Sequence, residues 1–223
     1  YATVIHLYLG GKEPIAALRV LGRMENQLQL VQQQQQQESE FQNIKGRLIQ
    51  YNRVLQGLVA STSLSTSSLS VAVQLLMSMC LQEDFSSNPI TLYDDDDDDY
   101  KNGETLMVGT TCNFLPMNIT PDAKSFATVI VQLIPKYYEN ERREHYNHFE
   151  NYKIIHKLIE QARRLDQLNN FLVKKINTTM SKAITDCDDD DNNNTGYIDL
   201  KNYIDFVIEK LLYPDLVSIP FDD

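Results

Sequence analysis

The sequence predicts a mainly α-helical protein: an irregular multi-helix bundle or an array of helical hairpins, with one small β-hairpin. Three observations favour this class. Apolar residues recur at spacings of three and four in several segments, which is typical of helices with one buried face. Glycine is scarce, with eight residues in all, and this disfavours folds that build sites from glycine-rich loops. Between residues 136 and 195 there is neither Pro nor Gly, so nothing there forces a helix to end.

A chain of 223 residues is long enough for one ordinary domain or two small ones. A change of composition near residues 86–89 predicts a boundary. Residues 1–85 are then an N-terminal helical region with Gln-rich and Ser-rich inserts. Residues 86–223 are a C-terminal region with an acidic-tipped hairpin, a long helix and a final helix over 200–212.

The first segment predicts two helices around a tight turn. Residues 1–9 are apolar, and Gly10, Gly11 and Pro14 separate them from a second apolar-periodic stretch. Proline suits the first turn of a helix, where its missing N–H costs nothing. Tyr8 and Ala17, on either side of this turn, resemble half of a repeat of the tetratricopeptide family. No second copy follows, so an ordinary helical hairpin is the expected structure.

A first apolar seam occupies residues 41–58, where apolar positions alternate between spacings of three and four. The seam is shorter than a free-standing coiled coil and includes Gly46 and Gly57. Packing within a bundle and pairing with a helix of a partner protein both remain open. The seam consists of Phe41, Ile44, Leu48, Tyr51, Leu55 and Leu58.

Residues 71–81 are apolar on every side, which predicts a helix buried in the core. Residues 90–93 and 104–108 favour strands, and they flank the acidic run Asp94 to Asp99. We therefore expect a β-hairpin whose acidic tip lies in solvent, because adjacent carboxylates repel one another.

Thr120, Pro121 and Asp122 together predict a helix start, since they combine a capping residue, a proline and an acid near the positive helix end. Pro135 is expected to kink or end this helix. Its predicted buried face consists of Phe126, Val129, Ile130 and Leu133.

The stretch from Lys136 to Thr185 predicts one long helix, with breaks allowed. Its apolar residues follow helical spacing, and Asn169 interrupts them. This second apolar seam consists of Ile155, Leu158, Ala162, Leu165, Leu172 and Ile176.

A basic stripe runs along the same stretch: Arg142, Lys153, Arg164 and Lys175 are spaced by eleven residues. Eleven residues make about three helical turns, so on one helix the four cations share a face opposite the second apolar seam. The face is either simply solvated, or it contacts an acidic partner, nucleic acid phosphates or the chain's own Asp runs.

The formal net charge of −11 comes from two inserts. Asp94 to Asp99 and the five acids among residues 186–191 supply eleven carboxylates, and without them the chain carries 20 acidic and 20 basic residues. The low pI therefore does not indicate an acidic domain surface, and a local basic face remains compatible with it.

Residues 191–202 resemble the calcium loop of the EF-hand family, with ligand types at several positions and the turn glycine at Gly196. Asn202, however, stands where the family has a bidentate Glu, so an acidic loop before a helix is expected instead. His145 and His148, near Glu141, match no metal motif and fit a solvated face. We predict no catalytic, cofactor-binding or metal-binding residues.

Cys80, Cys112 and Cys187 lie far apart, which favours neither a disulfide framework nor a thiolate metal site. A reducing intracellular location is expected. The low-complexity inserts favour the nucleus over the cytoplasm. No stretch is long and apolar enough to predict a membrane span.

Together these features predict a non-enzymatic scaffold or adaptor subunit of a larger intracellular assembly, which binds other protein subunits through its helical seams. The alternative is a nucleic-acid-associated regulatory module, in transcription or chromatin, that uses the basic stripe. No cofactor and no small-molecule ligand is indicated.

Overall fold

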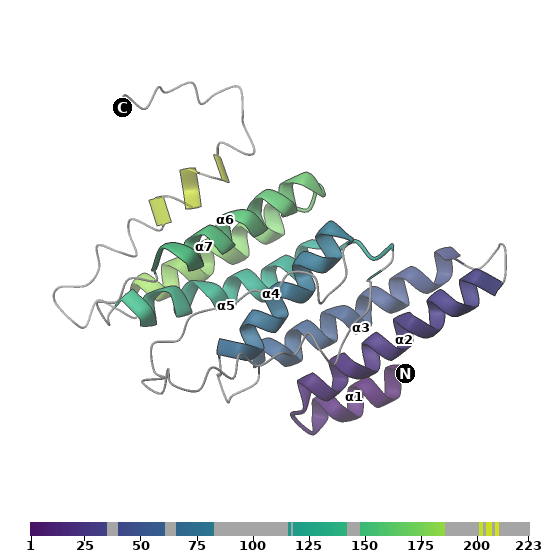
Figure 1. Cartoon of the computed structure of the whole chain (residues 1–223). Helices are drawn as coiled ribbons and strands as arrows, with labels where there is room; N and C mark the ends of the chain where they lie inside the picture. Colours follow the sequence, from purple (N-terminus) through teal and green to yellow (C-terminus); the bar gives the residue numbers. More distant parts are fainter. Residues whose placement is uncertain are drawn as a thin grey trace. The chain divides into compact units, whose positions relative to one another are not determined.

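The computed structural model shows a mainly α protein (Figure 1). Of the residues it describes, 86% are helical and none forms a strand. The predicted β-hairpin at 90–93 and 104–108 lies outside these residues. The described residues are 1–34, 40–60, 66–82, 116, 118–141, 148–185, 201–202, 204–206 and 208–209.

The chain divides into two compact units, Tyr1–Gln132 and Leu133–Asp223. The boundary predicted near residues 86–89 lies outside the described residues, so the division of the chain at that point stays a prediction. The first unit holds α1 (Ala2–Gly10), α2 (Pro14–Gln34), α3 (Glu40–Ala60), α4 (Thr66–Leu81) and the beginning of α5 (Ala123–Glu141). The second holds the end of α5, α6 (His148–Arg164) and α7 (Asn170–Thr185).

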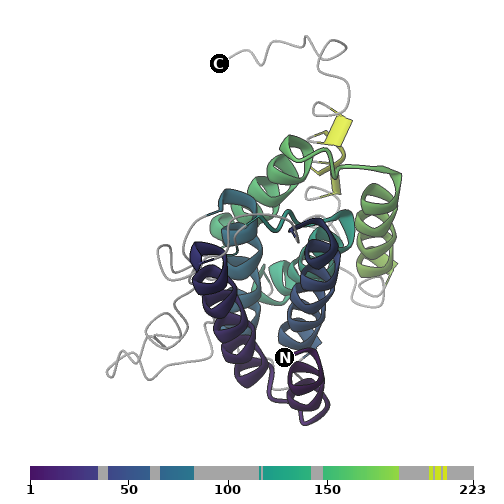
Figure 2. The same cartoon turned by 90° about the vertical axis from the view of Figure 1, so that its right-hand side faces the viewer.

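The first helices run back and forth, and each contacts the next along the chain. Figures 1 and 2 show α2 and α3 side by side in opposite directions, with α1 at the end of this pair where α2 begins. As predicted, Pro14 is the first residue of α2. The turn before it is closed by the Gly11 and Glu13 amides, which donate to Leu7 and Tyr8 carbonyls at 2.9 Å.

Gly57 allows α1 to approach α3 closely. A Cβ atom on Gly57 would overlap Cδ2 of Leu9 and would lie 3.6 Å from Cβ of Pro14. Gly46, on the same helix, has no such neighbour within 4 Å. Of the two glycines in the first apolar seam, only Gly57 therefore lies against a neighbouring side chain, and a larger residue there would require Leu9 to shift.

The prediction that residues 71–81 form a core helix is confirmed. Every residue of α4 from Leu69 to Cys80 is buried, including the polar side chains of Ser70, Gln74 and Ser78. A helix without a polar face is stable only when other elements cover it on every side.

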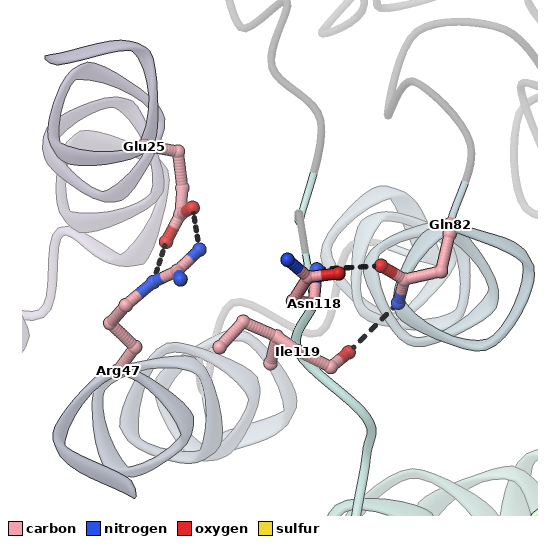
Figure 3. A network of polar contacts seen from close by, with 5 residues as sticks. All are labelled: Glu25, Arg47, Gln82, Asn118 and Ile119. Atoms are coloured by element: carbon pink, nitrogen blue, oxygen red, sulfur yellow. Dashed lines mark hydrogen bonds and ion pairs between the residues drawn. The ribbon is translucent and has the colours of Figure 1, made fainter. Parts of the chain in front are cut away.

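Gln82 follows α4 directly, and its side chain joins the end of this helix to a segment more than thirty residues further along the chain (Figure 3). Gln82 donates to the backbone carbonyls of Met79 at 2.6 Å and Ile119 at 3.1 Å, and it accepts from the amide of Asn118 at 2.8 Å. Gln82 and Asn118 both adopt a left-handed backbone with φ 55°. These bonds hold the two ends of the intervening segment together.

α5 begins at Ala123, with Asp122 as its cap, rather than with Thr120 as the capping residue. The Ser125 amide donates to Oδ1 of Asp122 at 2.8 Å, and the Asp122 amide donates to Oγ of Ser125 at 3.1 Å. This reciprocal pair is a capping box. Pro135 does not end α5, which continues to Glu141. The predicted buried face is confirmed: Phe126, Val129, Ile130 and Leu133 are all buried.

The long helix predicted over 136–185, for which breaks were allowed, is interrupted, because α6 ends at Arg164 and α7 begins at Asn170. Asp166 takes a left-handed backbone with φ 56°, and the amide of Gln167 donates to the carbonyl of Ala162 at 2.7 Å. This is the pattern of a Schellman motif formed without glycine. Asn169 then caps α7 by accepting from the amides of Phe171 and Leu172 at 3.1 and 3.2 Å.

Candidate functional site

The first apolar seam lies mainly in the interior of the first unit. Tyr51, Leu55 and Leu58 are fully buried, and Ile44 and Leu48 are half-buried. The side chain of Phe41 lies outside the described residues. These three buried residues pack against other parts of the same chain. Their burial agrees with packing within a bundle, which was one of the two alternatives for this seam.

The second apolar seam is also buried, although two helices carry it. Ile155, Leu158 and Ala162 of α6 and Leu172 and Ile176 of α7 are buried. Leu165, in the connection, is half-buried. Within each helix the apolar residues keep their helical spacing, so each helix turns one apolar face inward.

A buried ion pair joins α2 to α3, and the sequence analysis did not single it out (Figure 3). The guanidinium of Arg47 donates through Nε to Oε1 of Glu25 at 3.1 Å, and through a second nitrogen to Oε2. Glu25 is 0% exposed and Arg47 is 6% exposed. Two parallel hydrogen bonds fix both the distance and the orientation of the partners.

Burial raises the pKa of Glu25, although the hydrogen bonds and charge of Arg47 act in the opposite direction. The hydroxyl of Tyr51 also interacts with this carboxylate. Burial raises the pKa of Tyr51 well above its usual range, and the negative charge of Glu25 adds to the effect. Tyr51 therefore remains a neutral phenol over the physiological range, and the group of three acts as a structural connection between helices.

The signal for this pair was present in the sequence. Glu25 occupies an inward position in the helical period of Leu18 and Leu21, and Arg47 precedes the buried Tyr51 by one helical turn. When two successive helices each carry a charged residue at a position that the apolar spacing turns inward, and the charges are opposite, a buried ion pair is expected. Recognising it requires knowing that the two helices face each other.

A second polar cluster connects α3 to the start of α5. The hydroxyl of Ser125, which is buried, donates to Oδ1 of Asn52 at 2.6 Å. The amide of Asn52 reaches the carboxylate of Asp122 at 3.3 and 3.4 Å. These contacts join the helix cap to a neighbouring helix, so this cluster also has a structural role.

Among the described residues of the first unit, exposed apolar side chains gather on the outer face of α1. Tyr1, Val4, Leu7 and Tyr8 are exposed, and Leu7 is 67% exposed. Ile5 is the residue of α1 that is buried. The helix contains no Asp, Glu, Lys or Arg. Exposed apolar side chains that gather on one helix face are typical of interaction sites, whereas isolated ones are ordinary.

The basic stripe does not lie on one helix. Lys153 and Arg164 are both exposed on α6 and share a face, as their spacing predicts. Lys175 is exposed on α7, beyond the break at Asp166, so the spacing no longer relates it to the others. Arg142 lies outside the described residues.

The outer face of α7 carries another basic set at helical spacing. Lys174, Lys175, Thr178 and Lys182 are exposed, together with the aromatic side chain of Phe171. The ammonium of Lys175 lies 6.0 Å from the centre of the Phe171 ring. α7 contains no Asp or Glu. Nothing acidic on the helix itself therefore neutralises this face.

The remaining features of the sequence either lie outside the described residues or do not form a group of side chains that could bind a metal ion. The side chains of His145 and His148, and residues 186–200 of the acidic loop, are not described. Residues 201–202, 204–206 and 208–209 are helical, in keeping with the final helix. Among the described side chains, no group of three or more His, Cys, Asp or Glu is placed to hold a metal ion.

None of the helices in the described ranges combines the length and the apolar character needed to cross a bilayer. No family model, no curated protein and no solved structure matches the chain.

Proposed function

We propose that the protein is a non-enzymatic scaffold or adaptor subunit, and that the outer face of α1 receives an apolar helix of a partner protein. The supporting observation is the set of exposed apolar side chains on α1, Tyr1, Val4, Leu7 and Tyr8. The first apolar seam supplies part of the interior of the unit that carries this surface, because its buried residues pack within that unit.

A helical partner fits this surface better than a loop or a charged segment. α1 already packs on α2 and α3, so a further helix would continue the same mode of packing. The face has no charged side chain to pair with acids or bases. The expected interaction is an amphipathic helix that lays its apolar side on α1.

The position of α1 is defined by several contacts, so that the surface is formed before a partner arrives. Leu9 packs over Gly57 on α3. The Tyr1 hydroxyl donates to Oε1 of Gln27 on α2. A surface held in advance loses less conformational freedom on binding.

The test compares Leu7→Lys with Leu30→Lys. Both leucines are exposed on helices, at 67% and 59%, so both variants should fold with unchanged circular dichroism. Proteins that co-purify with the chain from its native source are identified, produced in pure form and titrated against each variant.

Leu7→Lys should weaken the affinity of the partner about tenfold or more, because burial of a leucine contributes about 1.5 to 3 kcal/mol. Leu30→Lys should change it less than about twofold. If both variants bind every purified partner as tightly as the original chain, α1 is not the docking surface.

A further inference from the structure

We propose that the outer face of α7, defined as Phe171, Lys174, Lys175, Thr178 and Lys182, binds single-stranded nucleic acid. This proposal concerns a different helix from α1 and does not depend on the scaffold function. The face of α7 takes the place of the basic stripe as the proposed contact for nucleic acid, because the residues of the basic stripe do not lie on one helix.

The five side chains form a continuous row. Relative to Phe171 they lie at positions +3, +4, +7 and +11, which is the spacing of neighbours on one helix face. All five are solvent-accessible, and the buried residues Leu172, Ile176 and Met180 lie on the opposite side of the helix. The row is about 16 Å long, at 1.5 Å per residue.

The charges of the row fit a phosphate backbone. Its three lysines have no carboxylate on the same helix, in a chain whose formal charge is −11. Thr178 adds a hydroxyl, although this side chain also donates to the carbonyl of Lys174 at 2.7 Å. Arg163 and Arg164, exposed at the end of α6, lie only a short connection away from the start of α7.

The aromatic ring favours a single strand over a duplex. Phe171 is 47% exposed, so its ring is accessible on the charged face of the helix. Unpaired bases stack on exposed aromatic rings, whereas the bases of a duplex are already stacked on each other. The Lys175 ammonium lies 6.0 Å from the centre of this ring. When a base stacks on the ring, the ammonium would be close enough to pair with the phosphate of the same nucleotide.

A lipid surface fits the row less well, because one apolar residue provides little insertion into a bilayer. The chain's own acids at residues 186–191 follow α7 directly and could compete for its lysines. The experiment therefore distinguishes both occupants from nucleic acid.

The experiment is a fluorescence anisotropy titration of the full chain with a labelled oligothymidylate of about 20 nucleotides, at several salt concentrations between about 50 and 200 mM. One variant carries Lys174→Gln, Lys175→Gln and Lys182→Gln. The matched control carries Lys12→Gln, Lys45→Gln and Lys124→Gln, which changes the net charge equally at exposed lysines of the first unit. A third variant carries Phe171→Leu.

We expect micromolar binding at low salt, weakened at least tenfold in the α7 triple variant and less than about twofold in the control. The slope of log Kd against log salt should fall by about 2, since each phosphate contact on a single strand contributes about 0.7. Phe171→Leu should weaken binding about fivefold or more, because a stacked base is lost.

Four results would overturn the proposal. The first is equal weakening by the two triple variants, which would mean that overall charge governs binding. The second is unchanged binding by Phe171→Leu. The third is tighter binding to anionic phosphatidylserine vesicles than to the oligonucleotide. The fourth is absence of binding both by the original chain and by a variant with Asp188 to Asp191 replaced by Asn, which removes the competing acids.

Discussion

The first unit and the helices α6 and α7 differ in whether charged side chains enter the interior. Between α2 and α3 the first unit buries a glutamate and an arginine, while α1 exposes apolar side chains. α6 and α7 bury apolar side chains and expose all of their described lysines and arginines. Among the described residues, the first unit therefore places an ion pair in its interior, whereas α6 and α7 place no charged side chain there.

The two regions therefore differ in what fixes the pairing of their helices. A buried ion pair contributes little net stability, since its desolvation offsets much of its attraction, but it penalises any pairing of helices that separates the charges. An apolar interior is more tolerant of shifts, so α6 and α7 rely on the Asp166 turn and the Asn169 cap to define their ends. The following predictions test each part of the contrast.

The largest effect is expected from Arg47→Ala. Removing the guanidinium leaves the buried carboxylate of Glu25 without its ion-pair partner, which should lower the free energy of unfolding by about 3 to 5 kcal/mol. Urea denaturation followed by circular dichroism measures this loss.

A double variant, Glu25→Met with Arg47→Met, is the reference for Arg47→Ala. It removes both charges and keeps apolar volume, so it should retain most of the stability. A loss below about 1 kcal/mol in Arg47→Ala would show that the pair is far more hydrated than its burial indicates.

In the second unit the largest effect should come from an apolar residue. Leu158→Ala opens a cavity at a fully buried position of α6 and should cost about 3 kcal/mol in the free energy of unfolding. Lys157→Ala, at the neighbouring exposed position, should change stability by less than about 0.5 kcal/mol. Equal effects of the two substitutions would contradict the inward orientation of the second apolar seam.

A smaller effect distinguishes the two glycines of α3. Gly57→Ala places a methyl group against Leu9 and should destabilise the protein by about 1 kcal/mol, with faster proteolysis at α1. Gly46→Ala, which meets nothing, should stabilise it by about 0.5 to 1 kcal/mol through helix propensity. If Gly57→Ala is as stabilising as Gly46→Ala, the contact of α1 with α3 is looser than the structure shows.

The smallest effect is expected from replacing Asp94 to Asp99 with a short Gly-Ser loop. The bonds of Gln82 to Asn118 and Ile119 close the ends of this segment, and closure entropy depends only weakly on the length between them. The change in the free energy of unfolding should stay below about 1 kcal/mol, as measured by thermal denaturation. A larger loss would show that the acidic run is part of an ordered surface.

The sequence by itself determined the helical class and most inward faces. The apolar residues on every side of the segment 71–81 predicted a helix buried on all sides, and the period of Phe126, Val129 and Ile130 predicted the buried face of α5. These features are local, because the spacing of apolar residues along a helix decides which side must be covered. The proline at position 14 acted equally locally, as the first residue of α2.

Tertiary structure decided which helices meet and where the long basic segment breaks. Glu25 and Arg47 are 22 positions apart, and only the pairing of α2 with α3 places them together. Gly57 differs from Gly46 only because α1 packs over it. At Asp166 the chain adopts a left-handed backbone, which Asp tolerates better than most residues but does not require, so the local sequence did not fix the break between α6 and α7. Local propensity permits such choices, and the contacts between distant residues select among them.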